Sequence, residues 1–290
     1  MDIKHLEKLD APFDDTDLVH EGFSFKPKSE NLVDIVKHTK PKGKHVFSVA
    51  AYGYPIVFLA EGAEMVVSCD VDYKSVLWNR FLRDLIRQQS YQQHIDSLFT
   101  SIESPDVDKV AKKLGGCIQP SKPFYWDRLI DLLVQFYEDL NAMKEIPSFY
   151  PHVRDAQTYA LVRQAVERGC WTITQMELRE FLKSMNGNDS PKLDVIYASS
   201  IRNWVLHHRF AGNINAFKED YDRELGALVS QSLNPKGVFY EALIDNDTLS
   251  PVRFPRNGIE ENLYLGLSII RHKSMVVGDN TELVVGTRGG

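Results

Sequence analysis

Short apolar runs alternate with longer amphipathic stretches along most of this chain. The run Val46 to Ala50 predicts a buried strand, and Pro55 suits the first turn of a helix that ends at Gly62. A second apolar run, Met65 to Cys69, predicts the next strand. A strand, a helix and a second strand in this order predict a right-handed βαβ unit, whose ligand crevice lies at the carboxyl ends of its strands.

The stretch after the second strand repeats apolar residues at helical spacing and predicts a long amphipathic helix. Its apolar positions are Val76, Leu77, Phe81, Leu85 and Ile86. With this helix, residues 44–88 form the first half of a Rossmann-type nucleoside fold.

The middle of the chain has a different pattern. Residues 89–167 are mostly helical in character, with several proline and glycine breaks, and Asp127 to Met143 is the clearest helix. This pattern predicts a helical cap inserted at 89–167. Residues 1–43 are expected to form an N-terminal helical or lid segment.

The alternation of strands and helices resumes at residue 168. Five further strands are expected: Cys170 to Thr174, Leu193 to Ala198, Val238 to Ile244, Tyr264 to Arg271 and Leu283 to Gly286. Between them, Leu178 to Met185 and Ile214 to about Leu233 are expected to form helices, and Asn234 to Gly237 a turn. The predicted fold class is α/β, a doubly wound and mostly parallel Rossmann-like sheet with an inserted helical cap. The nucleoside-binding domain is expected to comprise residues 44–88 and 168–290.

Composition excludes several functional classes. The 290 residues carry a formal net charge of −6, so no general positive field favours nucleic acid, and no nucleic-acid partner is predicted. No apolar run is long enough for membrane insertion. Three well-separated cysteines without CxxC spacing suggest neither a disulfide framework nor a zinc site, and we predict a cytoplasmic protein without a metal. The oligomeric state stays open, with a homodimer as one option.

The turn after the first strand lacks a full GxGxxG motif, which leaves NAD as a distant alternative. Only Gly53 is available there for close backbone approach to a ligand. Asp70 ends the second strand, 17 residues beyond Gly53, where a carboxylate can accept hydrogen bonds from both ribose hydroxyls of a nucleoside. The alternative role of Asp70 is a helix N-cap, for which Asp72 is the better placed residue.

A turn with few glycines also suits a ligand without a pyrophosphate, such as the sulfonium nucleoside S-adenosylmethionine. Tyr52 and Tyr54 flank Gly53. An aromatic face within about 6 Å of a sulfonium contributes roughly 0.5–2 kcal/mol. The alternative is that both rings pack at the strand end.

Several short segments together resemble one enzyme family. They are Val46 to Gly53, Cys69 to Asp72 with its long helix, Phe124 to Asp127, and Asp194 to Trp204. These segments resemble the S-adenosylmethionine-dependent 3-amino-3-carboxypropyl transferases related to the bacterial betaine-lipid enzyme that acts on diacylglycerol. In that family a hydroxyl residue, here Ser48, replaces the usual first-motif acid, and alanine, here Ala50, replaces the first glycine.

The resemblance implies a set of cofactor-binding residues. Asp70 would hold the ribose, the Ala50 to Gly53 backbone would lie against the methionine or ribose part, and Thr174 and Gln175 would flank adenine. The residues after the predicted strand Leu193 to Ala198 would face the amino-acid end or the acceptor, with Arg202 either pairing a carboxylate or lying at the surface. The full set is Ser48, Ala50, Tyr52, Gly53, Asp70, Asp72, Thr174, Gln175, Ser199, Ser200, Arg202 and Asn203.

The implied reaction transfers the 3-amino-3-carboxypropyl group to a small polar acceptor, or closes it on itself, and releases methylthioadenosine. Methyl transfer from the same cofactor to a small molecule is the first alternative, and a non-catalytic nucleoside-binding protein is the second. The protein chooses among the carbons of the sulfonium by which one it holds at about 3–3.5 Å from the nucleophile. No general base is assigned; Tyr125, Asp127 and Tyr150 are candidates by location alone.

Overall fold

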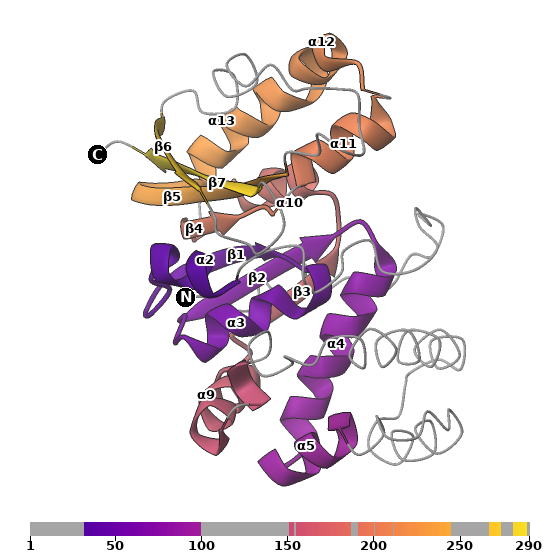
Figure 1. Cartoon of the computed structure of the whole chain (residues 1–290), viewed down its shortest axis with the longest axis vertical. Coiled ribbons are helices and arrows are strands. Elements are labelled where there is room, and N and C mark those ends of the chain that lie inside the picture. The colour runs from indigo at the N-terminus through magenta and orange to yellow at the C-terminus, as the bar shows by residue number, and fades with distance from the viewer. Residues whose placement is uncertain are drawn as a thin grey trace.

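The computed structural model describes residues 32–99, 151–153, 155–186, 191–199, 201–210, 212–244, 267–273 and 281–288. Its sheet has seven strands in the order β3-β2-β1-β4-β5-β7-β6 (Figure 1). The strands are β1 (His45–Val49), β2 (Met65–Asp70), β3 (Trp171–Gln175), β4 (Leu193–Tyr197), β5 (Leu233–Ile244), β6 (Leu267–Lys273) and β7 (Thr281–Arg288). The first five are parallel, and β7 runs antiparallel to both β5 and β6. The predicted α/β fold with a mostly parallel sheet is confirmed.

Helices cover both faces of the sheet because successive strand residues point to opposite faces and nearly all of them are apolar. One face packs against α2 (Leu32–Thr39), α3 (Tyr54–Ala60), α4 (Tyr73–Gln88) and α9 (Ala156–Glu167). The other packs against α10 (Leu178–Met185), α11 (Ile201–Arg209), α12 (Ile214–Phe217) and α13 (Arg223–Ser232). In Figure 1 α11, α12 and α13 lie above the sheet and α3, α4 and α9 lie below it.

The amphipathic pattern of α10 shows why these helices form. Leu178, Phe181, Leu182 and Met185 recur at helical spacing, and all four are buried against the sheet. The Phe181 ring packs against Phe47 of β1 in a tilted arrangement, with ring centroids 4.9 Å apart. The sequence therefore placed this helix at the residues where the structure has it.

The stretch expected as a single helix from Ile214 to Leu233 contains a π-helical segment. It runs as α12, then the π-helix η3 (Lys218–Asp222), then α13. A π segment widens the turn and is often found at functional sites. Here it directs Tyr221 and Asp222 toward different partners.

The start of β5 is irregular, where a turn was expected at Asn234 to Gly237. Leu193 pairs with Leu233 and Val195 with Val238, so residues 234–237 bulge out of the ladder. A Cβ at Gly237 would lie 2.8 Å from the Asn234 carbonyl oxygen, which explains the glycine.

The N-terminal segment predicted over residues 1–43 and the cap predicted over residues 89–167 remain predictions, because residues 1–31 and 100–150 lie outside the described residues. The described parts of the predicted cap include α5 (Tyr91–Phe99) and α9. The Tyr159 hydroxyl of α9 donates to the Gln89 carbonyl at 2.8 Å, which ties α9 to the segment between α4 and α5. None of the described helices is long and apolar enough to cross a membrane.

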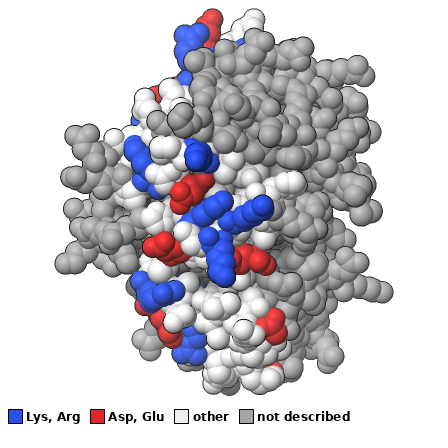
Figure 2. Space-filling model, turned by 90° about the vertical axis from the view of Figure 1, so that its left-hand side faces the viewer, with Lys and Arg blue, Asp and Glu red and all other residues white. Residues whose placement is uncertain are grey.

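The side of the molecule on which β1 begins carries charges of both signs. Figure 2 shows a group of basic side chains at the centre of this face, bordered by acidic ones. The described part of this surface is therefore mixed in sign. The opposite edge of the sheet, where β1 to β4 end, holds the predicted site.

Candidate functional site

The carboxyl ends of the parallel strands bring the predicted site segments to one edge of the sheet. β1 pairs in register with β2, so Val49 faces Cys69 and the turn after β1 lies beside Asp70. β2 pairs with β3, which places Asp70 opposite Gln175. Gly53 and Asp70 thus follow neighbouring strands, as a ribose between them requires.

The turn after β1 is a short 3₁₀ helix, Ala51–Gly53, that leads directly into α3. Gly53 has a φ of 89°, a left-handed conformation that glycine adopts without strain. The Ala50 N–H donates to the Cys69 carbonyl at 3.0 Å, which fixes the turn against β2.

Asn79 of α4 also holds this turn, and sequence reasoning missed it. Its side-chain amide donates to the carbonyl oxygens of Ala50 and of Ser75, and the residue is fully buried. The signal was a single amide within the apolar stripe of α4, between Val76 and Phe81. Such a buried amide needs partners, and here they are backbone groups of the predicted ligand turn.

Asp70 is the most informative residue of this edge. Its side chain is 6% exposed, and Oδ1 accepts a hydrogen bond from the Asp72 N–H at 3.0 Å. Oδ2 is buried and has no hydrogen-bond partner among the described residues. Burial, followed by the neighbouring charge of Asp72, raises the pKa of Asp70 to about 7.

A buried carboxylate oxygen without a donor is costly, because it has lost its water and gained nothing in return. A ligand that presents a hydroxyl donor at this position would remove the cost. The residues present therefore fit the ribose of a nucleoside such as S-adenosylmethionine.

The residues at the end of β3 divide between the two faces of the sheet. Gln175 shares the face of Asp70, and its Nε2 donates to the Val71 carbonyl at 3.2 Å. Thr174 pairs with Cys69 and so lies on the opposite face, with its Oγ1 buried and unpartnered among the described residues. The structure brings Gln175 next to Asp70 but turns Thr174 away.

Ser48 and Tyr197 are paired across β1 and β4. The Ser48 hydroxyl donates to the Val49 carbonyl at 3.1 Å. The Tyr197 ring packs on Tyr54 and Phe58 of α3, while its hydroxyl is buried without a partner among the described residues. Tyr197 is thus a second residue that sequence reasoning did not single out, and Tyr54 packs at the strand end.

Ser199 follows β4 with a φ of 53°, which is unusual for a residue other than glycine. Such backbone strain persists only where the surroundings hold it, and it is often found at binding sites. Ser199 is buried. Ser200, Tyr125, Asp127 and Tyr150 lie outside the described residues, as do the side chains of Tyr52 and Asn203.

Arg202 lies in a buried ionic cluster, the Arg202 triad, with Asp222 of η3 and Glu241 of β5. Its Nε and its Nη2 contact Asp222 Oδ1 at 2.8 Å and 2.7 Å, and its Nη1 contacts Glu241 Oε2 at 2.8 Å. Burial raises the pKa of Asp222 to about 6, with Arg202 opposing and Glu241 reinforcing the shift. The alternative that Arg202 lies at the surface is therefore wrong, and its guanidinium is engaged by carboxylates of the protein itself.

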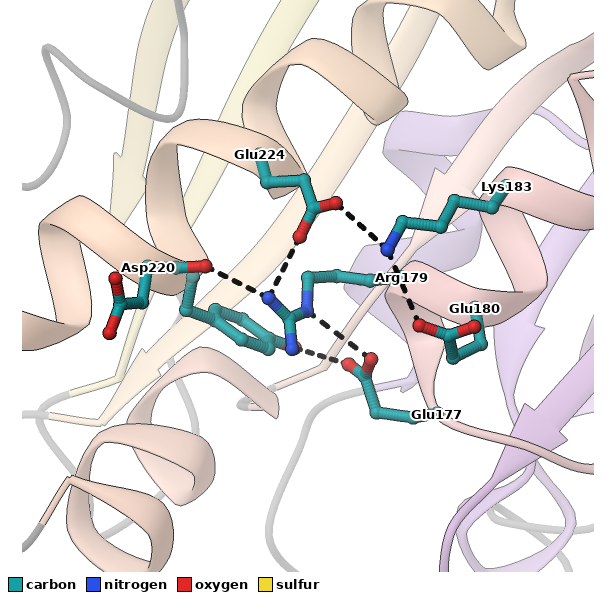
Figure 3. A network of polar contacts seen from close by, with 7 residues as sticks. Glu177, Arg179, Glu180, Lys183, Asp220 and Glu224 are labelled. Atoms are coloured by element: carbon teal, nitrogen blue, oxygen red, sulfur yellow. Dashed lines mark hydrogen bonds and ion pairs between the residues drawn. The ribbon is translucent and has the colours of Figure 1, made fainter.

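A second ionic network connects α10 to η3 and α13 at the surface, and Figure 3 shows its members. Arg179 contacts Glu177 at 3.3 Å and Glu224 at 2.9 Å, and Lys183 contacts Glu224 at 2.8 Å. The Tyr221 hydroxyl donates to Glu177 at 2.8 Å. We call this set the α10 network. It connects the loop after β3 to the same π-helix that carries Asp222.

Among the described residues, no group of three or more histidine, cysteine or acidic side chains could hold a metal ion.

No protein-family model matches the chain, and no curated protein matches it. Solved structures match the chain at low identity and with TM-scores below 0.5. The glycopeptide N-methyltransferase MtfA, complexed with S-adenosylmethionine, is 14% identical with a TM-score of 0.42; the match covers 96% of this chain and 100% of MtfA. A TehB-like SAM-dependent methyltransferase from Corynebacterium glutamicum is 11% identical with a TM-score of 0.39, covering 90% and 88%. We take the fold from the strand order of the sheet and not from these matches.

Proposed function

We propose that this protein is an S-adenosylmethionine-dependent transferase whose cofactor ribose binds to Asp70. The observation that carries the proposal is the buried and unpartnered Oδ2 of Asp70 at the tip of β2, beside the Gly53 turn. A ribose diol supplies two hydroxyl donors in the arrangement that a carboxylate accepts.

The residues around Asp70 divide the work of holding the cofactor. The Ala50–Gly53 turn, fixed by Asn79 and by β2, gives the backbone a close approach to the ribose and methionine parts. Gln175 lies beside Asp70 on the β3 side of the proposed site and donates to the Val71 carbonyl. The bound cofactor supplies a sulfonium, an electrophile that is already activated, so the protein mainly has to orient an acceptor toward one of its carbons.

The transferred group is proposed to be 3-amino-3-carboxypropyl, on the strength of the sequence segments that resemble that family. The acceptor is proposed to be a small polar molecule. The solved structures named above are methyltransferases, so methyl transfer is the first alternative to test.

The binding half of the proposal is tested by calorimetric titration of S-adenosylmethionine into the wild type and Asp70→Asn. Loss of hydrogen bonds to a charged group should weaken binding by about 1.5–3 kcal/mol, which is roughly 10- to 150-fold. Asp84→Asn on the outer part of α4 is the matched control and should bind as the wild type does. Equal affinity in all three proteins would rule out the Asp70 site.

The chemical half is tested by mass analysis of the nucleoside co-product after incubation with S-adenosylmethionine and a panel of small polar acceptors. Methylthioadenosine is expected for aminocarboxypropyl transfer. S-adenosylhomocysteine without methylthioadenosine would establish methyl transfer instead. Tight binding with neither product over the whole panel would establish the non-catalytic alternative.

A further inference from the structure

Asn79 is a buried amide on α4, the helix that begins just after Asp70 and Asp72. Its side chain is fully buried, and its Oδ1 has no hydrogen-bond partner among the described residues. Buried residues on either side of it along the same helix face are apolar, namely Val76, Leu82 and Ile86. A buried amide oxygen without a donor lowers stability, so the packing of α4 alone does not explain an amide at this position.

The nitrogen of this amide holds the turn that follows β1. Nδ2 donates to the carbonyl oxygens of Ala50 and Ser75, and a carbonyl oxygen can only accept, so the nitrogen has to face both. Because a peptide group is planar, fixing the Ala50 carbonyl also fixes the N–H of Ala51, where the 3₁₀ turn begins. From the other side, the Ala50 N–H donates to the Cys69 carbonyl at 3.0 Å. The turn is therefore held by α4 and β2 together.

Asp70 keeps its position by other contacts. The ladder between β2 and β3 places Asp70 opposite Gln175, and Asp70 Oδ1 accepts the Asp72 N–H at 3.0 Å. None of these contacts involves Asn79. The carboxylate proposed to bind ribose and the turn after β1 therefore have separate supports, and loss of one support leaves the other in place.

The two supports serve different parts of the proposed cofactor. Asp70 and the turn follow neighbouring strands, which lie about 4.8 Å apart. With the ribose at Asp70 and adenine on the β3 side, the group that extends from the ribose through sulfur is directed to the β1 side. The turn held by Asn79 is then beside the aminocarboxypropyl part.

We propose that Asn79 is a positioning residue for the aminocarboxypropyl part of the cofactor and that it acts through the Ala50 carbonyl. This inference rests on the proposed function and adds to it a residue that does not touch the ligand. Asn79 and Asp70 should therefore be separable by ligand: Asp70 affects every ligand with a ribose, whereas Asn79 affects only ligands that reach the turn.

The test compares S-adenosylhomocysteine with methylthioadenosine, two thioethers that share adenine and ribose and differ in the aminocarboxypropyl group. Each is titrated calorimetrically into the full chain. Asn79→Leu keeps the branched shape of the side chain without the donor. It should bind S-adenosylhomocysteine about 2- to 12-fold more weakly, as expected for one lost neutral hydrogen bond, and methylthioadenosine as the wild type does. Asp70→Asn should weaken the binding of both ligands.

Two further variants separate positioning from stability. Asn79→Ala removes the same donor without added bulk, and it should change the ratio of the two affinities in the same direction. Leu85→Ala is the matched control, because Leu85 is fully buried six residues further along α4. It should lower the midpoint of urea denaturation and leave the ratio of the two affinities unchanged.

Three results would overturn the inference: an unchanged ratio in either folded Asn79 variant, an equal change of the ratio in Leu85→Ala, or loss of the folded state in both Asn79 variants. The last two would assign the amide to helix stability. Failure of the proposed function is a different result, in which the wild type binds neither thioether or Asp70→Asn binds both as the wild type does. In that case the inference about Asn79 is rejected together with the proposed function.

Discussion

The Arg202 triad and the α10 network use the same kinds of side chain in opposite environments. They are joined through consecutive residues of one π-helix, because Tyr221 contacts Glu177 of the network and Asp222 contacts Arg202 of the triad. The triad is buried, whereas Lys183 and Glu224 of the network are 44% and 39% exposed. Water and salt screen the exposed pair of Lys183 and Glu224, so this pair adds little stability, whereas the loss of one partner of the buried triad is strongly destabilising.

Removal of the buried guanidinium is expected to have the largest effect. Arg202→Met would leave two buried carboxylates without a cation and should lower the free energy of unfolding by about 3–5 kcal/mol. Urea denaturation followed by circular dichroism measures this loss. Arg179→Met removes the matching cation of the α10 network and should cost no more than about 1 kcal/mol. Equal losses would show that burial does not separate the two regions.

The second prediction concerns pH. Burial raises the pKa of Asp222 from 3.8 to about 6, so between these values the folded state binds more protons than the unfolded state. The stability that Asp222 contributes is therefore fully present below pH 4 and is lost as the pH rises through 6. A shift of about two units corresponds to about 3 kcal/mol between pH 4 and pH 7.

The measured quantity is the free energy of unfolding as a function of pH, compared between the wild type and Asp222→Asn. The comparison is needed because buried His94 and His152 have lowered pKa values and change the stability of both proteins in the opposite direction. The same comparison between the wild type and Asp70→Asn should show a stability difference of the same sign, and this difference should keep changing up to about pH 7 because the pKa of Asp70 is raised to about 7. If the stability difference between the wild type and each variant did not change with pH, the raised pKa values of Asp222 and Asp70 would be contradicted.

The hydrogen bond that joins the network to the π-helix should have an intermediate effect. Tyr221→Phe removes only the hydroxyl that donates to Glu177 and keeps the ring stacked on Phe217. Because the acceptor is a carboxylate, the expected loss is about 1.5–3 kcal/mol. Phe217→Leu tests the ring stack separately, and a null result for Tyr221→Phe would show that Arg179 alone holds Glu177.

The smallest effect is expected for the ion pair between Arg179 and Glu224. A double-mutant cycle with alanine at both positions should give a coupling of about 0.2–1 kcal/mol at low salt. The coupling should disappear near 1 M salt, where the screening length is about 3 Å. A coupling that persists at high salt would show that this pair is shielded from water as the triad is.

Most of the fold could be predicted from local patterns. All seven strands overlap the apolar runs that predicted them, although β5 begins at Leu233, five residues before its predicted run, and the predicted helix at Leu178 to Met185 matches α10 residue by residue. The single helix predicted over Ile214 to Leu233 was interrupted by a π segment, because periodicity detects an amphipathic face but not one widened turn. The candidate site was partly predictable, since Asp70 and Gly53 were singled out from their positions at the end of one strand and after another.

The sequence by itself determined the order of elements, the two buried faces of the sheet and the edge at which Asp70 lies, because these follow from side-chain periodicity and from residues a few positions apart. Only the tertiary structure decided the partners of Arg202, which are 20 and 39 residues away, and the role of Asn79 against the Ala50 turn. Charged and amide side chains pair with groups that the fold brings near them, and a local sequence pattern does not predict these distant partners. Burial then decides which carboxylates, like Asp70 and Asp222, keep a buried oxygen that has no hydrogen-bond partner among the described residues.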